Sequence, residues 1–168
     1  MIFVTVGTHE QQFDRLVRCI DELKGNHIIT EDVVIQTGFS RYVPKHCSWS
    51  KLFSYKDMIK YVNEARIVIT HGGPSSFIMA LQVGKIPIVV PRQKQYDEHV
   101  NDHQLEFAKA VEERQGNIIV VEQMEQLKEM ILNYETKIQS VSTVHRSNNE
   151  RFNREFAKRV EELFEKRK

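Results

Sequence analysis

The feature that most constrains the fold of this chain is a regular alternation of apolar segments with segments of helical periodicity. We expect six short strands, at residues 2–6, 32–37, 51–54, 66–70, 86–90 and 118–121. Apolar residues recur at helical spacing in residues 13–25, 57–65, 101–114 and 124–133, and another helical segment follows residue 76. This alternation predicts an α/β fold with one doubly wound, mostly parallel sheet and right-handed crossovers.

Length and composition predict one globular domain with a C-terminal extension. The chain has 168 residues, of which 40% are hydrophobic and 28% charged, and this suits one domain with a real core. We expect the domain at residues 1–135, a polar connector at 136–149 and an amphipathic helix at 150–168. Three phenylalanines on one face of that helix predict docking on its own sheet, on a partner chain or on a membrane surface.

Charge and cysteine content argue against several classes of protein. The net charge of +1 argues against nucleic acid as the main partner. No signal peptide precedes the strand that starts at Ile2, and no apolar run approaches the roughly 18 residues that span a bilayer, so we expect a cytoplasmic protein. Cys19 and Cys47 offer no disulfide framework and are expected to be free thiols.

Polar loops follow two neighbouring strands of the expected sheet. The strand at 66–70 runs into residues 71–76, and the strand at 86–90 runs into residues 91–104. Open α/β sheets bind ligands in the crevice beyond the carboxyl ends of their strands, so both loops are expected to face one ligand.

The first of these loops has the composition of an anion site. Gly72 and Gly73 allow a tight turn and a close approach to a ligand, and Pro74 suits the first position of a helix. The hydroxyls of Ser75 and Ser76 would join free N–H groups at the helix start, where phosphate binds well. The alternative is a purely structural strand-to-helix turn, because the motif is no standard phosphate fingerprint.

Six blocks of sequence, taken in order, resemble a known family. They are FVTVGTHEQ at 3–11, FDRL at 13–16, VIQTG at 34–38, THGGP at 70–74, PRQKQ at 91–95 and HVNDHQ at 99–104. Together they resemble bacterial exopolysaccharide and capsule glycosyltransferases of the glycosyltransferase 28 C-terminal type. These proteins are similar to the C-terminal half of the peptidoglycan N-acetylglucosaminyltransferase and to the soluble catalytic subunit of the dolichol-linked N-acetylglucosamine transferase.

The resemblance implies a Rossmann-like domain that forms the C-terminal, donor-binding half of a GT-B glycosyltransferase. Its ligand would be a uridine diphosphate (UDP) sugar, with the diphosphate at the 71–76 turn and the donor sugar at the loop after Val90. The residues that the resemblance and the loop composition place at the substrate are Gly7, Thr8, His71, Gly72, Gly73, Pro74, Ser75, Ser76, Arg92, Gln95, Asp97, Glu98, His99, Asn101, His103 and Gln104.

Two positions carry particular expectations. Arg92 is expected to neutralise phosphate charge or, alternatively, to be a solvated surface cation. Met79 stands where related enzymes often carry an acidic residue for the ribose, and a thioether is no strong acceptor, so ribose contacts would come from backbone or from a group such as Gln82.

His9 and Glu10 are the catalytic candidates on this chain. The resemblance implies an inverting transfer, which needs a general base for the acceptor hydroxyl, and histidine has an accessible pKa. His9 could instead orient the diphosphate or pack at a turn, and the base could belong to a partner. No metal or other cofactor is expected, because the four-residue spacing of His99 and His103 has no cysteine pair beside it and is better explained by sugar binding or helix capping.

A partner follows from the resemblance and from length. A complete enzyme of this type needs two facing domains, and this chain has residues for about one. We expect a membrane-anchored, acceptor-binding subunit that recruits the chain to a lipid-linked saccharide at the inner face of the membrane. The expected reaction is transfer of galactose in a β-1,4 linkage; the alternative is a non-catalytic donor-binding or activating subunit.

Overall fold

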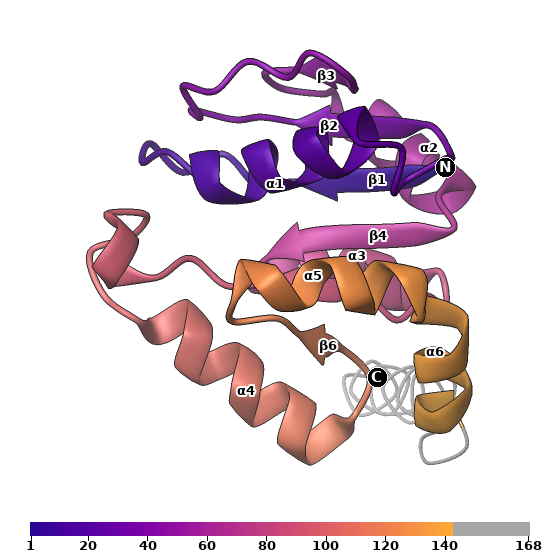
Figure 1. Cartoon of the computed structure of the whole chain (residues 1–168). Coiled ribbons are helices and arrows are strands. Elements are labelled where there is room, and N and C mark those ends of the chain that lie inside the picture. The colour runs from indigo at the N-terminus through magenta and orange to yellow at the C-terminus, as the bar shows by residue number, and fades with distance from the viewer. Residues whose placement is uncertain (143–168) are drawn as a thin grey trace, which may run out of the picture.

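The expected alternation is realised in one six-stranded sheet in which every neighbouring pair of strands is parallel (Figure 1). The structure is a computed structural model, and it describes residues 1–142. The strands, in chain order, are β1 (Ile2–Thr5), β2 (Val33–Gln36), β3 (Ser48–Ser50), β4 (Ile67–His71), β5 (Ile88–Val90) and β6 (Ile119–Val120). Their spatial order is β3-β2-β1-β4-β5-β6. The predicted doubly wound α/β fold is therefore confirmed.

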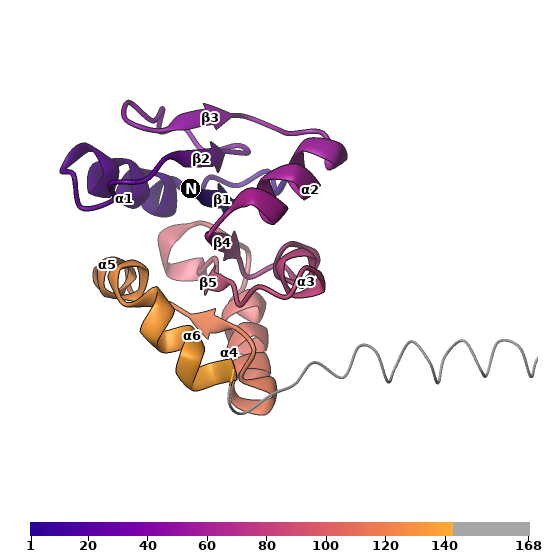
Figure 2. The same cartoon turned by 90° about the vertical axis from the view of Figure 1, so that its right-hand side faces the viewer.

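Helices cover both faces of the sheet (Figure 2). They are α1 (Asp14–Gly25), α2 (Tyr55–Glu64), α3 (Pro74–Gln82), α4 (His103–Gln115), α5 (Met124–Leu132) and α6 (Tyr134–Ser142), with a short 3-10 helix η1 at Lys94–Tyr96. The larger core cluster lies between the sheet and the pair α1 and α5, and two smaller clusters lie under α2, α3 and α4. Alternation along β1 divides the core: Ile2 and Val4 face α1, whereas Phe3 faces α2.

The strand order makes the carboxyl ends of β1 and β4 the place where a ligand crevice is expected. Chain connections leave these two adjacent strands in opposite directions, one toward β2 and the other toward β5. At such a switch point the loops at the carboxyl ends diverge and leave room for a ligand. The loops that begin at Gly7 and Gly72 border this point, and the loop after β5 lies beside them.

Several boundaries differ from the sequence predictions for local physical reasons. The third strand lies at Ser48–Ser50 and not at 51–54, because this segment pairs with β2 and places Ser50 opposite Gln36. The side chain of Phe53 turns inward and packs beside Phe3. Ser54 then caps α2 by accepting a hydrogen bond from the Asp57 N–H at 3.1 Å, so α2 begins earlier than expected.

The start of the expected connector at 136–149 is helical. Residues 136–142 belong to α6. Tyr134 anchors the start of this helix: its ring is buried in the larger core cluster, and its hydroxyl donates to the Ile86 carbonyl at 2.7 Å. The amphipathic helix expected at 150–168 lies outside the described residues, as does its proposed role at a partner interface.

A buried carboxylate fixes the loop that precedes β3. Asp21 of α1 accepts hydrogen bonds from the Tyr42 hydroxyl at 2.8 Å, the Lys45 N–H at 2.9 Å and the His46 N–H at 2.7 Å. Burial works to raise the pKa of Asp21, but these hydrogen bonds outweigh burial and hold the pKa below its usual value. Asp21 therefore stays ionised and ties this loop to α1.

We predict that Asp21→Asn lowers the free energy of unfolding by about 1–3 kcal/mol at neutral pH, because an amide is a weaker acceptor for these donors. A carboxyl with a lowered pKa stabilises the fold above its usual pKa of 3.8 and loses that contribution as pH falls below it, so the deficit should shrink in acid. Urea denaturation over a pH series measures both effects. Asp32→Asn is the matched control, because Asp32 is exposed; a deficit that is equal in acid would contradict the assignment.

Candidate functional site

The turn between β4 and α3 presents backbone donors to the crevice. Gly73 is the N-cap of α3 and makes no side-chain capping bond, and Pro74 is the first helical residue. In the first turn the Ser76 N–H bonds the Gly73 carbonyl at 3.1 Å, and Ser75 is exposed. Within the described chain, the N–H groups of Gly73 and Ser75 have no recorded acceptor. A helix start of this kind favours an anion through its N–H groups and its dipole.

Close packing requires three glycines here, Gly7 and Gly73 against the His71 ring and Gly72 against Gln104. A Cβ atom on Gly7 would lie 2.7 Å from Nε2 of the His71 ring, and one on Gly73 would lie 2.9 Å from its Cδ2. A Cβ on Gly72 would lie 2.9 Å from the Cβ of Gln104. Gly7 also has a φ of +75°, which side chains rarely adopt. The glycines thus let the loops after β1 and β4 close over one imidazole ring.

The imidazole of His71 is neutral at neutral pH. The residue is 8% exposed, and its Nδ1 atom has no hydrogen-bond partner. Burial lowers the pKa of His71 to about 4, and the charges of Arg92, His9 and His99 act in the same direction. The backbone of Thr5 opposes the shift without reversing it. A neutral ring is able to donate one hydrogen bond to a bound group without adding a buried charge.

His9 and His99 meet across the crevice. Their ring centroids lie 4.8 Å apart, although one residue follows β1 and the other follows β5. The Nε2 atom of His9 is 3.0 Å from the Gln11 Oε1, and the Nδ1 atom of His99 accepts from the Asn101 N–H at 3.4 Å. Both rings are partly exposed. The structure therefore brings histidines from three different loops to the switch point.

The other candidates have different degrees of access. Thr8, Glu10, Gln95 and Asp97 are exposed, and Asp97 adopts a left-handed φ of 54° at the end of η1. The amide of Gln95 donates to the Gln93 side chain at 2.6 Å. These side chains border the crevice without forming one cluster.

His103 does not act together with His99. His103 begins α4 and is 78% exposed, whereas His99 lies before the helix, so the two imidazoles do not share a helix face. Asn101 accepts from the His103 N–H at 3.2 Å and so supports the helix start. Among residues 1–142, no group of three histidine, cysteine or carboxylate side chains has the arrangement of a metal site.

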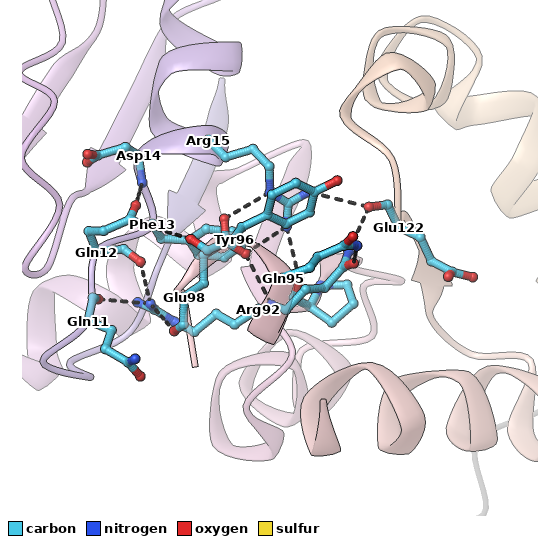
Figure 3. A network of polar contacts seen from close by, with 12 residues as sticks. Gln11, Gln12, Phe13, Asp14, Arg15, Arg92, Gln95, Tyr96, Glu98 and Glu122 are labelled. Carbon is cyan, nitrogen blue, oxygen red and sulfur yellow. Dashed lines mark hydrogen bonds and ion pairs between the residues drawn. The ribbon is translucent and has the colours of Figure 1, made fainter. Parts of the chain in front are cut away.

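Arg92 departs from both sequence expectations. It is fully buried, so it is neither a surface cation nor a group that reaches a phosphate. Its guanidinium donates to the carbonyls of Val6 at 2.9 Å, Gln11 at 2.9 Å, Gln12 at 2.9 Å and Glu98 at 3.1 Å (Figure 3). Burial lowers its pKa only to about 10, so the charge remains. Arg92 therefore joins the loop after β1 to the loop after β5 through these buried hydrogen bonds.

Glu98 is also a structural residue, contrary to the expectation that it binds sugar hydroxyls. It is fully buried and accepts two hydrogen bonds from Arg15, from Nε and from Nη2, each at 2.9 Å (Figure 3). A third bond comes from the Gln93 N–H at 3.1 Å. Arg15 also lies over the ring of Tyr96, with its Cζ 4.5 Å from the ring centre. Sequence reasoning missed Arg15, although it lies in the FDRL block, because nothing in that block showed its partner.

An open pocket of about 650 Å³ lies beside this network, between α1 and α5. Arg15, Tyr96 and Glu98 form part of its wall, together with Arg18 and Met124. It contains no residue of the glycine turn and none of the three histidines. We therefore place the candidate site at the switch point, where the backbone donors are, and not in this pocket.

Residues 1–160 match the family model of the glycosyltransferase family 28 C-terminal domain. The chain belongs to this family. The UDP-N-acetylglucosamine transferase subunit ALG13 of Homo sapiens is 35% identical over 117 residues, which cover 64% of this chain and 10% of the human protein. The protein of the same name from Mus musculus is 34% identical over 121 residues, covering 64% and 9%. The chain thus spans about a tenth of the length of these curated relatives.

A solved structure confirms the class of fold. The glycotransferase of kitacinnamycin superposes with a TM-score of 0.57 at 14% identity, over 84% of this chain and 37% of that chain. At this identity the likeness concerns the fold alone. It supports the expected Rossmann-like sheet.

We predict that Arg92→Ala lowers the free energy of unfolding by about 3 kcal/mol or more, because several buried carbonyls lose a charged donor. Arg92→Lys should cost less, since it keeps the charge but not the forked geometry. Urea denaturation followed by circular dichroism measures both. Arg18→Ala is the control, because Arg18 is exposed over the Tyr42 ring and should cost about 1 kcal/mol or less. Equal stability of Arg92→Ala and the wild type would contradict the role of Arg92 in joining the two loops.

Proposed function

We propose that this chain is the donor-binding catalytic subunit of an inverting glycosyltransferase that uses a UDP-sugar. The observation that carries the proposal is the glycine turn at the start of α3, which offers unpartnered N–H groups at the switch point of a family 28 C-terminal domain. A diphosphate is the part of the donor that suits such a turn. The family and the names of the relatives support a nucleotide-sugar ligand.

The same turn suits the departing group of the reaction. As the bond to the sugar breaks, negative charge grows on the diphosphate, and the N–H groups and dipole of α3 would stabilise it. The charge of Arg92 adds to this field without contact, while neutral His71 lies beside the turn. We propose that this electrostatic stabilisation needs no metal cofactor.

His9 is proposed as the general base that accepts the proton of the acceptor hydroxyl. It lies on the loop after β1, next to His99 and facing the same crevice as the glycine turn. Glu10 is exposed on the same loop and is the second candidate. A base on the partner remains the alternative that kinetics must separate from these two.

Two lines of support for the identity of the donor sugar point to different sugars. The names of the mammalian relatives point to N-acetylglucosamine, whereas the resemblance to exopolysaccharide and capsule enzymes points to galactose in a β-1,4 linkage. Met79 packs against the apolar cluster under α2 and α3, and its thioether does not replace a carboxylate as a strong acceptor for the ribose. Transfer assays with UDP-galactose, UDP-glucose and UDP-N-acetylglucosamine would decide the donor.

A second, acceptor-binding subunit is proposed as the partner. The relatives are named as subunits, and the described residues form one Rossmann-like sheet. No helix within residues 1–142 has the length and apolar character to cross a membrane. We propose a membrane-anchored partner that presents a lipid-linked saccharide at the inner face of the membrane. A donor-binding subunit whose partner performs the chemistry is the second candidate.

We predict that the chain binds UDP and that Gly73→Ala weakens binding about tenfold or more, because the added Cβ would push His71 into the turn. Isothermal titration with UDP measures the affinity. Gly84→Ala is the control, because a Cβ there meets no atom within 4 Å. Gly84 has a φ of +74°, so this substitution strains the backbone at Gly84 and leaves the glycine turn unchanged. A folded Gly73→Ala chain with unchanged affinity would rule out the turn as the diphosphate site.

We predict that His9→Ala lowers turnover by roughly 10²–10⁴-fold and leaves UDP affinity nearly unchanged, as expected for loss of a general base. The assay uses the chain together with its acceptor-binding partner and a lipid-linked acceptor. Glu10→Gln tests the second candidate, and His46→Ala, at an exposed loop position, is the control. A near-normal rate for both His9→Ala and Glu10→Gln would move the base to the partner.

A further inference from the structure

The outer edge of the sheet at β3 has an unusual composition. Residues 39–56, here called the β3 edge, contain four lysines and arginines and no aspartate or glutamate, in a chain whose net charge is only +1. All four cations are exposed: Arg41, Lys45, Lys51 and Lys56. None of the ion pairs recorded among residues 1–142 uses them. This segment therefore carries four exposed cations without an ion-pair partner among residues 1–142, and the next acidic residue along the chain is Asp57.

The same edge exposes large apolar side chains. Tyr55 is 75% exposed, Leu52 49% and Trp49 45%, and Phe39 and Val43 are exposed as well. Lys51 lies over the ring of Phe39, with its Nζ 4.6 Å from the ring centre, so the loop after β2 and the segment after β3 form one surface. Both views show β3 as the outermost strand, at the side of the molecule away from α4 and α6 (Figures 1 and 2).

Protection of an edge strand explains only half of this pattern. Lysines on an edge strand discourage pairing with other chains, but a protected edge would not also expose tryptophan, leucine and tyrosine. Protein interfaces are depleted in lysine, and a surface for nucleic acid has no use for the aliphatic Leu52 and Val43. Cations interleaved with aromatic and aliphatic side chains match the interface of an anionic bilayer, where tryptophan and tyrosine lie at the headgroups.

We propose that the β3 edge docks directly on the surface of an anionic lipid bilayer. Leu52, Trp49 and Tyr55 enter the headgroup region, and Lys51 and Lys56 pair with lipid phosphates and carboxylates. Phe39 and Leu52 follow the carboxyl ends of β2 and β3, which is the same edge of the sheet as the glycine turn. Docking there brings the crevice near the lipid surface. The contact needs no nucleotide sugar, so it stands or falls separately from the proposed reaction.

The chain contains one tryptophan, and it is Trp49, so the proposed contact has a built-in reporter. The full chain is mixed with vesicles of phosphatidylcholine containing phosphatidylserine, and with pure phosphatidylcholine vesicles. We expect co-sedimentation and a shift of Trp49 emission to shorter wavelength with the anionic vesicles alone. Added salt should weaken both signals, because it screens exposed charges.

Variants separate this surface from general electrostatic attraction. Each surface cation contributes about fivefold to binding of an anionic membrane, so Lys51→Glu with Lys56→Glu should weaken binding by about 25-fold or more. Arg114→Glu with Lys128→Glu is the matched control, with the same charge change at exposed positions on α4 and α5. Melting temperatures confirm that each variant folds. Three results would each overturn the proposal: an equal loss of binding in the control pair, vesicle binding without a shift of Trp49 emission, or no binding to anionic vesicles. A protein or nucleic acid bound at the β3 edge would then explain its composition.

Discussion

The candidate site depends on one buried guanidinium. Arg92 has no carboxylate bonded to it, because the nearby Glu98 carboxylate is taken by Arg15; its charge is met by four backbone carbonyls and by the face of Phe13, 4.8 Å from Cζ. Those carbonyls belong to two loops that are about 80 residues apart in the chain. Arg92 thus joins the loop carrying His9 to the loop carrying His99, together with a hydrogen bond from the Gln12 side chain to the Tyr96 carbonyl at 3.0 Å. Without Arg92, each loop would have to satisfy its own carbonyls with water.

This arrangement determines the electrostatics of the crevice. Arg92 keeps its charge but is fully buried, so it would act on an anion through its field, which is weakly screened in a buried position. The same field, with burial, holds His71 neutral, and a second cation is therefore not placed beside the first. For the proposed diphosphate, the available donors are the backbone N–H groups at the start of α3, where Gly7 and Gly73 allow close packing. The arrangement therefore supports an anion site built mainly from backbone donors.

The sequence predicted the fold well because the fold rests on local periodicity and on the rules of parallel sheets. Most of the strand and helix segments, including the helix that ends at residue 25, follow from those. The burial of individual polar residues could not be predicted from these rules. Arg92 and Glu98 stand in a polar loop, and no local pattern tells a buried charge from an exposed one; only the fold brings Arg15 from α1 to Glu98 and explains why both are withdrawn from solvent. The predicted position of β3 was wrong for a similar reason, because pairing with β2, and not local composition, determines that the strand lies at Ser48–Ser50.

The division between fixed and exposed groups also indicates where specificity can vary. Arg92 and the Arg15–Glu98 pair tie the crevice walls to the core, so substitutions there affect folding before they affect choice of ligand. Exposed side chains such as Thr8, Glu10 and Asp97 lie on the loops after β1 and β5 and take no part in this buried network. Substitutions at these positions change the exposed surface without touching the buried network or the close-packed glycines. Under the proposed function, such substitutions would change the contacts to the donor sugar and leave the turn proposed for the diphosphate intact.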